Sequence, residues 1–249
     1  MSTFLTMYVD GTFLSASSLF HQLFTIQGFM YNAYIPHVFC LLPGKGIPVY
    51  EAAVHHVMAE IIDLRFIFQL AYLYGDFDKA VHTSGRNVWP SISTKGCRFH
   101  LGRSWWRNIQ KCGSTNEYKD NQSEIGRFLK CFFGLPFLRP DDVGPCLLED
   151  FISIQPDNER VRKFTDYAFD NYVEPNSSFS SVTWADYSST TTQTTNPCES
   201  FYSHLIGSLY AAHPDIYILA DTLLQIQCDV YAKIRDVHRR HLGELGFSR

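Results

Sequence analysis

Three acidic side chains stand where this sequence could hold metal ions. Asp10 follows the apolar run 4–9, and Asp76 follows a second apolar run, 66–74. Glu199 stands in the first turn of a helix predicted further along the chain. Carboxylate oxygens are the ligands that Mg²⁺ prefers, and two such ions can stabilise the attacking and leaving oxygens of an in-line displacement at phosphorus. The three acids therefore predict a site for two Mg²⁺ or Mn²⁺ ions.

The two aspartates also have structural interpretations. Asp10 precedes a glycine, and Asp-Gly is a common hairpin turn. Asp76 or Asp78 could cap the helix that follows them, because Asp is a preferred residue at that position. The choice between Asp76 and Asp78 as the second metal ligand stays open.

Glu199 has a structural alternative of the same kind. Asn196 is a good cap for the predicted helix, and a Glu three residues later could complete a capping box. If Glu199 has only this role, Asp186 in the preceding loop is the next candidate for the third acid.

The elements that would position these acids can be predicted from periodicity. The runs before Asp10 and Asp76 predict strands buried on both faces, and groups that act on ligands gather at the carboxyl ends of such strands. Runs 19–26 and 33–42 predict an antiparallel meander with the first strand, with Pro36 indicating an edge strand. A further short strand is predicted at 97–100. Helices are predicted at 49–62, 78–88, 101–109, 123–133, 140–154, 158–171, 196–213 and from 214 onward.

This order of elements predicts an α/β fold divided into three segments. Residues 1–100 form the first part of a core, and residues 101–172 form an all-α insertion. Residues 173–249 comprise a Ser/Thr-rich loop and C-terminal helices that complete the core. In the last helix, a row of apolar residues predicts a packing stripe: Ile216, Leu219, Leu223, Ile226, Val230 and Ile234.

Composition and charge narrow the class of protein. The 249 residues are 45% hydrophobic, enough for a large core, and the net charge is −4. Between Lys95 and Lys130, however, eight Lys or Arg stand against three acidic residues, a local excess of five positive charges (8 − 3). This segment predicts a basic surface that could contact nucleic acid through Arg98, Arg103, Arg107 and Lys111, or a solvated helix face.

The cysteines and the apolar runs predict an intracellular protein without a membrane span. Seven cysteines are widely spaced and odd in number, a pattern typical of reduced chains. No apolar run reaches the length of a membrane span, and the N-terminus lacks the basic flank of a signal peptide.

Five fragments of the chain, taken in order, resemble a known family. They are Asp10-Gly11-Thr12-Phe13, Gln22-Leu23-Phe24-Thr25-Ile26, Tyr74-Gly75-Asp76-Phe77-Asp78-Lys79-Ala80, Gly96-Cys97-Arg98-Phe99-His100-Leu101 and Thr195-Asn196-Pro197-Cys198-Glu199-Ser200-Phe201. Together they resemble the catalytic domain of Mutator-like element (MULE) transposases, particularly the forms found in animal genomes. The resemblance covers nearly the whole chain.

The resemblance implies a DDE transposase with a ribonuclease-H-like mixed sheet, interrupted by a helical insertion. Asp10, Asp76 and Glu199 would be the metal-binding catalytic acids. His100, from the family's Cys-x-x-His pair, would position DNA or a metal-bound water, with Cys97 as a supporting residue. A further supporting residue would be Asn196. The implied activity is metal-dependent DNA strand cleavage and strand transfer at element ends. The implied partners are transposon ends and target DNA, the active form is a homo-oligomer, and the location is nuclear.

Other interpretations of the same residues remain. Cys97 and His100 could be half of a zinc site with Cys112 as a third ligand, although structural zinc requires four ligands. Gly75 stands where the family usually has Thr or Ser, and Asp78 where it has Glu. No zinc-dependent DNA-binding module precedes the first strand, which predicts a truncated relic or a separated catalytic core. The alternative functions are therefore an inactive or domesticated binding protein and, less favoured, a ribonuclease-H-like hydrolase.

Overall fold

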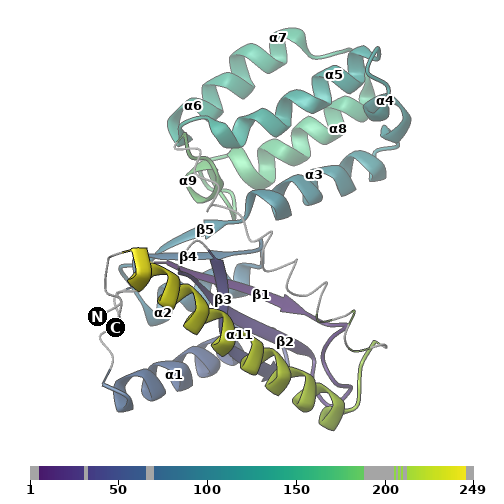
Figure 1. The fold of residues 1–249 in the computed structure, drawn as a ribbon. Helices are drawn as coiled ribbons and strands as arrows, with labels where there is room; N and C mark the ends of the chain where they lie inside the picture. Colours follow the sequence, from purple (N-terminus) through teal and green to yellow (C-terminus); the bar gives the residue numbers. More distant parts are fainter. Residues whose placement is uncertain are drawn as a thin grey trace. The chain divides into compact units, whose positions relative to one another are not determined.

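A computed structural model of the chain describes residues 6–30, 33–65, 70–187, 205, 207, 209 and 212–244. The strands are β1 (Thr6–Thr12), β2 (Gln22–Met30), β3 (Ala33–Leu42), β4 (Tyr72–Gly75) and β5 (Ser93–Gly96). They form a five-stranded sheet in the order β3-β2-β1-β4-β5 (Figure 1). The protein is therefore of the α/β class, as predicted.

The first three strands are the predicted meander. β1 pairs antiparallel with β2, and β2 pairs antiparallel with β3, with a register shift between Ile26 and Gln27. β3 lies at the edge of the sheet, which is where Pro36 can be accommodated. β4 and β5 run parallel, because the Ser93 N–H bonds the Ala71 carbonyl at 2.9 Å and, four residues further along both strands, the Cys97 N–H bonds the Gly75 carbonyl at 2.8 Å. The sheet is therefore mixed.

The helices of the described residues are α1 (Ile47–Asp63), α2 (Lys79–Val88), α3 (Arg98–Lys111), α4 (Thr115–Lys119), α5 (Glu124–Cys131), α6 (Pro140–Pro145), α7 (Ile152–Ile154), α8 (Glu159–Ala168), α9 (Ser181–Trp184) and α11 (Ile216–Glu244). Most of them lie where the sequence predicts them, whereas α4 and α9 were not predicted, and most of the helix predicted at 196–213 lies outside the described residues. A 3-10 helix, η1 (Phe132–Phe137), and two π-helices, η2 (Cys146–Phe151) and η3 (Phe169–Val173), continue α5, α6 and α8. None of the helices in this part of the chain is long and apolar enough to cross a membrane.

The chain divides into two compact units. The first, here called the sheet unit, comprises Met1–Leu73, Thr83–Ser93 and Asn196–Arg249. The second, the helical unit, comprises Tyr74–His82 and Thr94–Thr195. The helical unit is thus longer at both ends than the predicted insertion, 101–172.

In the sheet unit, the meander is covered on both faces. On one face, Leu23 of β2 shares a buried cluster with Leu219 of α11, which runs along the strands in Figure 1. On the other face, the ring of Phe24 lies 5.1 Å from that of Tyr50 in α1. Successive residues of a strand point to opposite faces, so Leu23 and Phe24 each meet a different helix. The sequence predicted an apolar packing stripe on this helix. The cluster confirms the stripe for Ile216, Leu219, Leu223 and Ile226.

In the helical unit, the core is built around Trp105 of α3. This side chain is 1% exposed, and its ring lies 5.7 Å from that of Phe133 and 5.8 Å from that of Trp184 in edge-to-face geometry. The indole N–H of Trp184 donates to the carbonyl of Tyr172 at 3.0 Å. Trp184 therefore anchors the segment after η3 to the core, and a buried Trp is stable there because its N–H has a partner.

Gly126 lies where α5 passes closest to the end of α4. A Cβ at this position would stand 2.9 Å from the Asp120 carbonyl oxygen and closer still to that of Glu117, and both are backbone atoms. We expect Gly126→Ala to lower the free energy of unfolding by about 2–3 kcal/mol, because the two helices must separate. Chemical denaturation of the full chain measures this.

The matched control is Gly144→Ala in α6. No atom lies within 4 Å of a Cβ built at Gly144, so alanine should leave the stability unchanged or raise it by up to about 1 kcal/mol through helix propensity. Equal effects of the two substitutions would contradict the close approach of α5 to α4.

Candidate functional site

Asp10 lies inside β1, near its carboxyl end. The strand continues to Thr12, and Asp10 is paired with Thr25 of β2. Its side chain is 7% exposed, and its Oδ1 accepts a hydrogen bond from the N–H of Gly11 at 2.9 Å. The hairpin-turn interpretation of Asp10 and Gly11 is therefore wrong, because both residues belong to the ladder. Asp10 is a nearly buried carboxylate in a central strand.

The side chain of Asp10 belongs to the face of the sheet that α11 covers. Its partner Thr25 is two residues from Leu23, so the three side chains share one face. Leu205 and Leu209, which are helical and four residues apart, are buried in the cluster that contains Leu23. The chain after Glu199 therefore packs on the face that carries Asp10. Glu199 and Asn196 themselves lie outside the described residues.

Gly11 and Gln22 fix the strand end beside Asp10. A Cβ on Gly11 would lie 2.6 Å from Oε1 of Gln22, which is buried on the opposite face from Asp10. The Gln22 amide donates to the carbonyl of Gly44 and to the hydroxyl of Tyr50, both at 2.9 Å. Sequence reasoning missed this support, although a glycine inside a strand is a signal for a close approach of this kind.

Asp76 follows β4 directly, and the two nearby aspartates have different contacts. The Oδ1 of Asp76 accepts from the N–H of Asp78 at 3.0 Å, and the carbonyl of Asp76 lies 2.7 Å from a ring nitrogen of His82. The Oδ1 of Asp78 accepts from the N–H of Ala80 at 2.8 Å, at the start of α2. Asp78 is thus the helix-capping residue, which favours Asp76 as the candidate metal ligand.

Cys97 and His100 begin a helix, so the strand predicted at 97–100 is wrong. The strand β5 ends at Gly96, and α3 starts at Arg98 with Cys97 as its cap. The helix forms here because Leu101 starts an apolar row, at every fourth residue, that packs into the core. Cys97 is buried and His100 half-buried.

The zinc alternative fails on distance. Cys112 caps the far end of α3, which is about 22 Å from Cys97 at 1.5 Å per residue. Ligands of one zinc ion each lie about 2 Å from the metal. Cys112 therefore cannot join Cys97 and His100 at one ion.

Arg98 is engaged inside the helical unit. One guanidinium N–H donates to the Asp186 carbonyl at 2.7 Å, and the guanidinium lies 4.7 Å from the ring centre of Phe137. Burial lowers the pKa of Arg98, and the charge of Asp186 opposes this shift. Burial likewise lowers the pKa of Lys95, whose ammonium donates to the Val182 carbonyl at 2.8 Å, and Asp186 again opposes the shift. These contacts favour a structural role for Arg98 over the predicted DNA contact, and a counter-ion role for Asp186 over that of a third ligand.

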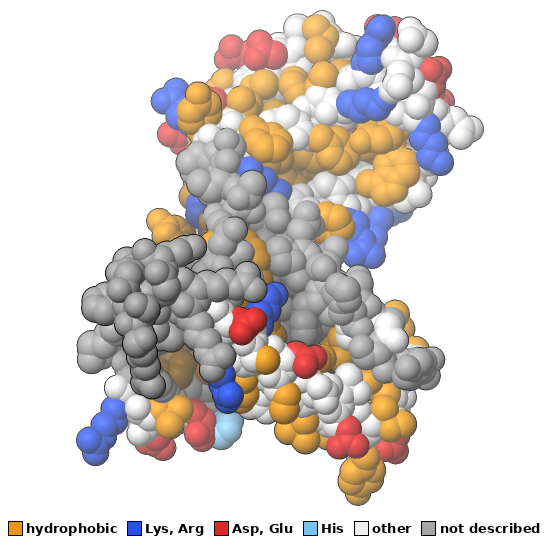
Figure 2. Space-filling model, in the orientation of Figure 1, with side chains coloured by type: hydrophobic (Ala, Val, Ile, Leu, Met, Phe, Trp, Pro, Cys, Tyr) orange, Lys and Arg blue, Asp and Glu red, His pale blue; other side chains and the backbone are white. Residues whose placement is uncertain are grey.

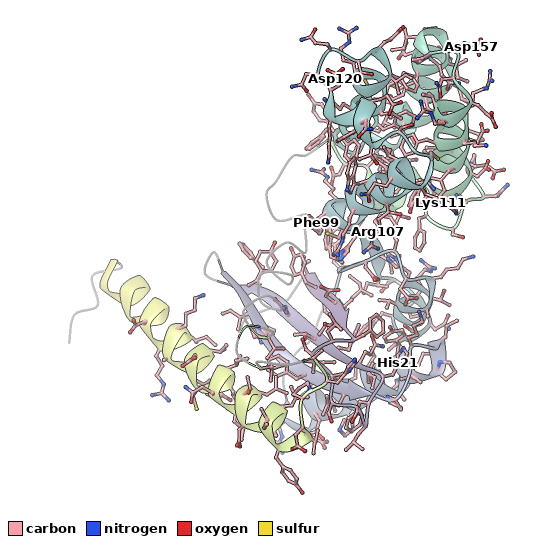
Figure 3. All side chains as sticks on the ribbon, turned by 90° about the vertical axis from the view of Figure 1, so that its right-hand side faces the viewer. His21, Phe99, Arg107, Lys111, Asp120 and Asp157 are labelled. Atoms are coloured by element: carbon pink, nitrogen blue, oxygen red, sulfur yellow. The ribbon has the colours of Figure 1, made fainter. Side chains whose placement is uncertain are left out.

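Arg103, Arg107 and Lys111 form an exposed row on α3. They are spaced four residues apart, so they lie on one side of the helix, and all three are exposed. Leu101, at the start of the buried row, shows that the other side faces the core. Figure 3 labels Arg107 and Lys111 on this helix, with Phe99 at its beginning. The three cations, here called the α3 basic row, can bind phosphate groups.

Possible metal ligands do not form a complete site in the described ranges. Within them, no set of three or more His, Cys, Asp and Glu side chains is placed to hold a metal ion, and the predicted ligand Glu199 lies outside them. Comparisons of the sequence with protein-family models and with curated proteins found no match.

Proposed function

We propose that the chain is the catalytic core of a DDE transposase that cleaves and joins double-stranded DNA in the nucleus. Asp10, Asp76 and Glu199 would hold two Mg²⁺ or Mn²⁺ ions. The observation that carries the proposal is the strand order, in which β1, with Asp10, neighbours β4, which Asp76 follows. This order, with the first strand beside the fourth, is the one expected of a ribonuclease-H-like sheet. Ends of neighbouring central strands are where ligand-binding groups of α/β proteins gather.

The two aspartates suit a hard cation. Each presents carboxylate oxygens, and each has one oxygen oriented by a backbone N–H, that of Gly11 for Asp10 and that of Asp78 for Asp76. Such oriented carboxylates lose less conformational freedom when they bind a ligand. Bound there, two metal ions would supply charge stabilisation at the attacking and leaving oxygens of a phosphodiester.

The position of Leu205 supports the assignment of Glu199 as the third acid. Glu199 stands six residues before Leu205, so at most about 20 Å of extended chain separates them. Leu205 is 1% exposed and packs on the face of the sheet to which Asp10 belongs. Glu199 is therefore within chain reach of that face.

The DNA would be held by the α3 basic row. We expect replacement of Arg103, Arg107 and Lys111 by Gln to weaken binding to duplexes of any sequence, because the row meets phosphates rather than bases. The dependence of log K on log salt should flatten by about one unit for each phosphate that is no longer neutralised. Fluorescence anisotropy with labelled duplexes over a series of salt concentrations measures both quantities.

A matched control removes three other cations of the same unit. Arg139, Arg162 and Lys163 are exposed, but each pairs with an acid on a neighbouring turn or loop, at 2.9, 2.8 and 2.7 Å. Their replacement by Gln should leave the salt slope nearly unchanged. The same slope change in both triple variants would indicate a general charge effect and no specific role for α3.

The direct test of the function uses the purified full chain with supercoiled DNA and Mg²⁺ or Mn²⁺. Nicking that requires the metal and stops with EDTA is the expected result. Salt-dependent DNA binding without any nicking would favour the inactive, transposase-derived binding protein instead, because the α3 basic row alone can account for binding.

A further inference from the structure

The helix α11 carries a second apolar row besides the one that packs on the sheet. Leu219, in the packed row, is fully buried. The second row lies about a third of a turn away and faces outward, with Tyr217 79%, Leu224 58% and Tyr231 53% exposed. The small residues Ala220 and Cys228 complete it and are also exposed. Figure 2 shows hydrophobic side chains on the surface along this helix.

The second row has a two-fold pattern centred on Leu224. Tyr217 and Tyr231 stand seven residues before and after it, and Ala220 and Cys228 stand four residues before and after it. Spacings of three and four keep all five side chains on one side of the helix. The row therefore reads the same in both directions, large–small–large–small–large.

We propose that a second copy of this chain binds the row, with the two α11 helices antiparallel about a two-fold axis at Leu224. Each Leu224 then meets its counterpart, and Tyr217 packs against the partner's Tyr231. Ala220 packs against the partner's Cys228, so the small side chains let the helices approach. A symmetric patch of this kind is what an isologous dimer requires.

The area of the row corresponds to a weak association. Tyr217, Leu224 and Tyr231 are already partly buried, so their exposed parts in the two copies together can remove roughly 700–800 Å² from water. This value is below that of stable interfaces, so we expect a weak dimer in reversible equilibrium with the monomer. The proposal concerns association alone and holds whether or not the chain cleaves DNA.

Sedimentation of the full chain over a range of concentrations tests the association. Wild-type protein should form a dimer, and Leu224→Glu should be monomeric because it places two carboxylates together at the axis. The control is Gln225→Glu, which adds the same charge one residue away, at an exposed position outside the row. Circular dichroism checks that both variants fold. A monomeric wild type, or equal dissociation of the two variants, would overturn the proposal.

Cross-linking under mild oxidation tests the direction. In a Cys228→Ser background, Leu224→Cys should form a disulfide-linked dimer, while Asp229→Cys, exposed and outside the row, should not. Ala220→Cys should cross-link when Cys228 is present and fail to do so when Cys228 is replaced by Ser. Cross-linking of wild-type protein through Cys228, detected by its loss in Cys228→Ser, would indicate parallel helices and refute the antiparallel pairing.

Discussion

Asp10→Asn is expected to abolish metal-dependent DNA cleavage while leaving the sheet unit folded. Asparagine keeps the shape of the buried side chain, and its amide oxygen can still accept from the Gly11 N–H. It removes the negative charge that a metal ion requires, and loss of about 4 kcal/mol of transition-state stabilisation corresponds to a roughly 10³-fold lower rate. Asp76→Asn should have the same effect. Conversion of supercoiled to nicked DNA gives the rate, and circular dichroism reports the fold.

Asp78→Asn is the matched control for both variants. Asp78 caps α2 through its side-chain oxygen, and Asn is an equally good cap, so stability and cleavage should change little. Cleavage by Asp10→Asn at the parental rate would remove Asp10 from the metal site. An equal loss in Asp76→Asn and Asp78→Asn would show that the capping contact does not distinguish the two residues.

Glu199→Gln should likewise lose cleavage by about 10³-fold, with a thermal midpoint close to that of the parent. As a metal ligand, Glu199 contributes charge that Gln lacks, and removal of one such ligand again costs several kcal/mol of transition-state stabilisation. In a capping box, by contrast, Gln replaces Glu without loss. Parallel measurements of thermal unfolding and of nicking rate separate the two roles.

The competing candidate for the third acid is tested by Asp186→Asn. Asp186 lies beside Lys95 and Arg98, whose pKa values its charge raises against the effect of burial. Its replacement should therefore disturb the helical unit more than the chemistry. If Asp186→Asn abolished cleavage without unfolding and Glu199→Gln did not, Asp186 would become the third acid.

Much of the sheet unit could be predicted from the sequence because its signals are local. The apolar run of β1, the β-branched and aromatic runs of β2 and β3, the proline of the edge strand and the apolar stripe of α11 are each contained in a short stretch of the chain. The basic segment was predicted from a local charge count that includes Arg103 and Arg107, and the structure places both on an exposed side of α3. Local periodicity determines which face of an element is apolar.

The tertiary structure decided what depends on residues distant in the chain. The DNA contact of Arg98 stays a prediction, but only the tertiary structure shows that its guanidinium bonds the carbonyl of a residue 88 positions away. Residues 97–100 were predicted to form a strand. They instead begin α3, which is stabilised by packing of Trp105 and its neighbours against later helices. Asp10 and Gly11 favour a turn in isolation, yet pairing with Thr25 holds them in a strand. For the helix after Gly96 and for the strand at Asp10, the free energy of burial and of long-range pairing exceeds the weak local preference. That free energy comes from residues distant in the chain, so a short stretch of sequence does not reveal it.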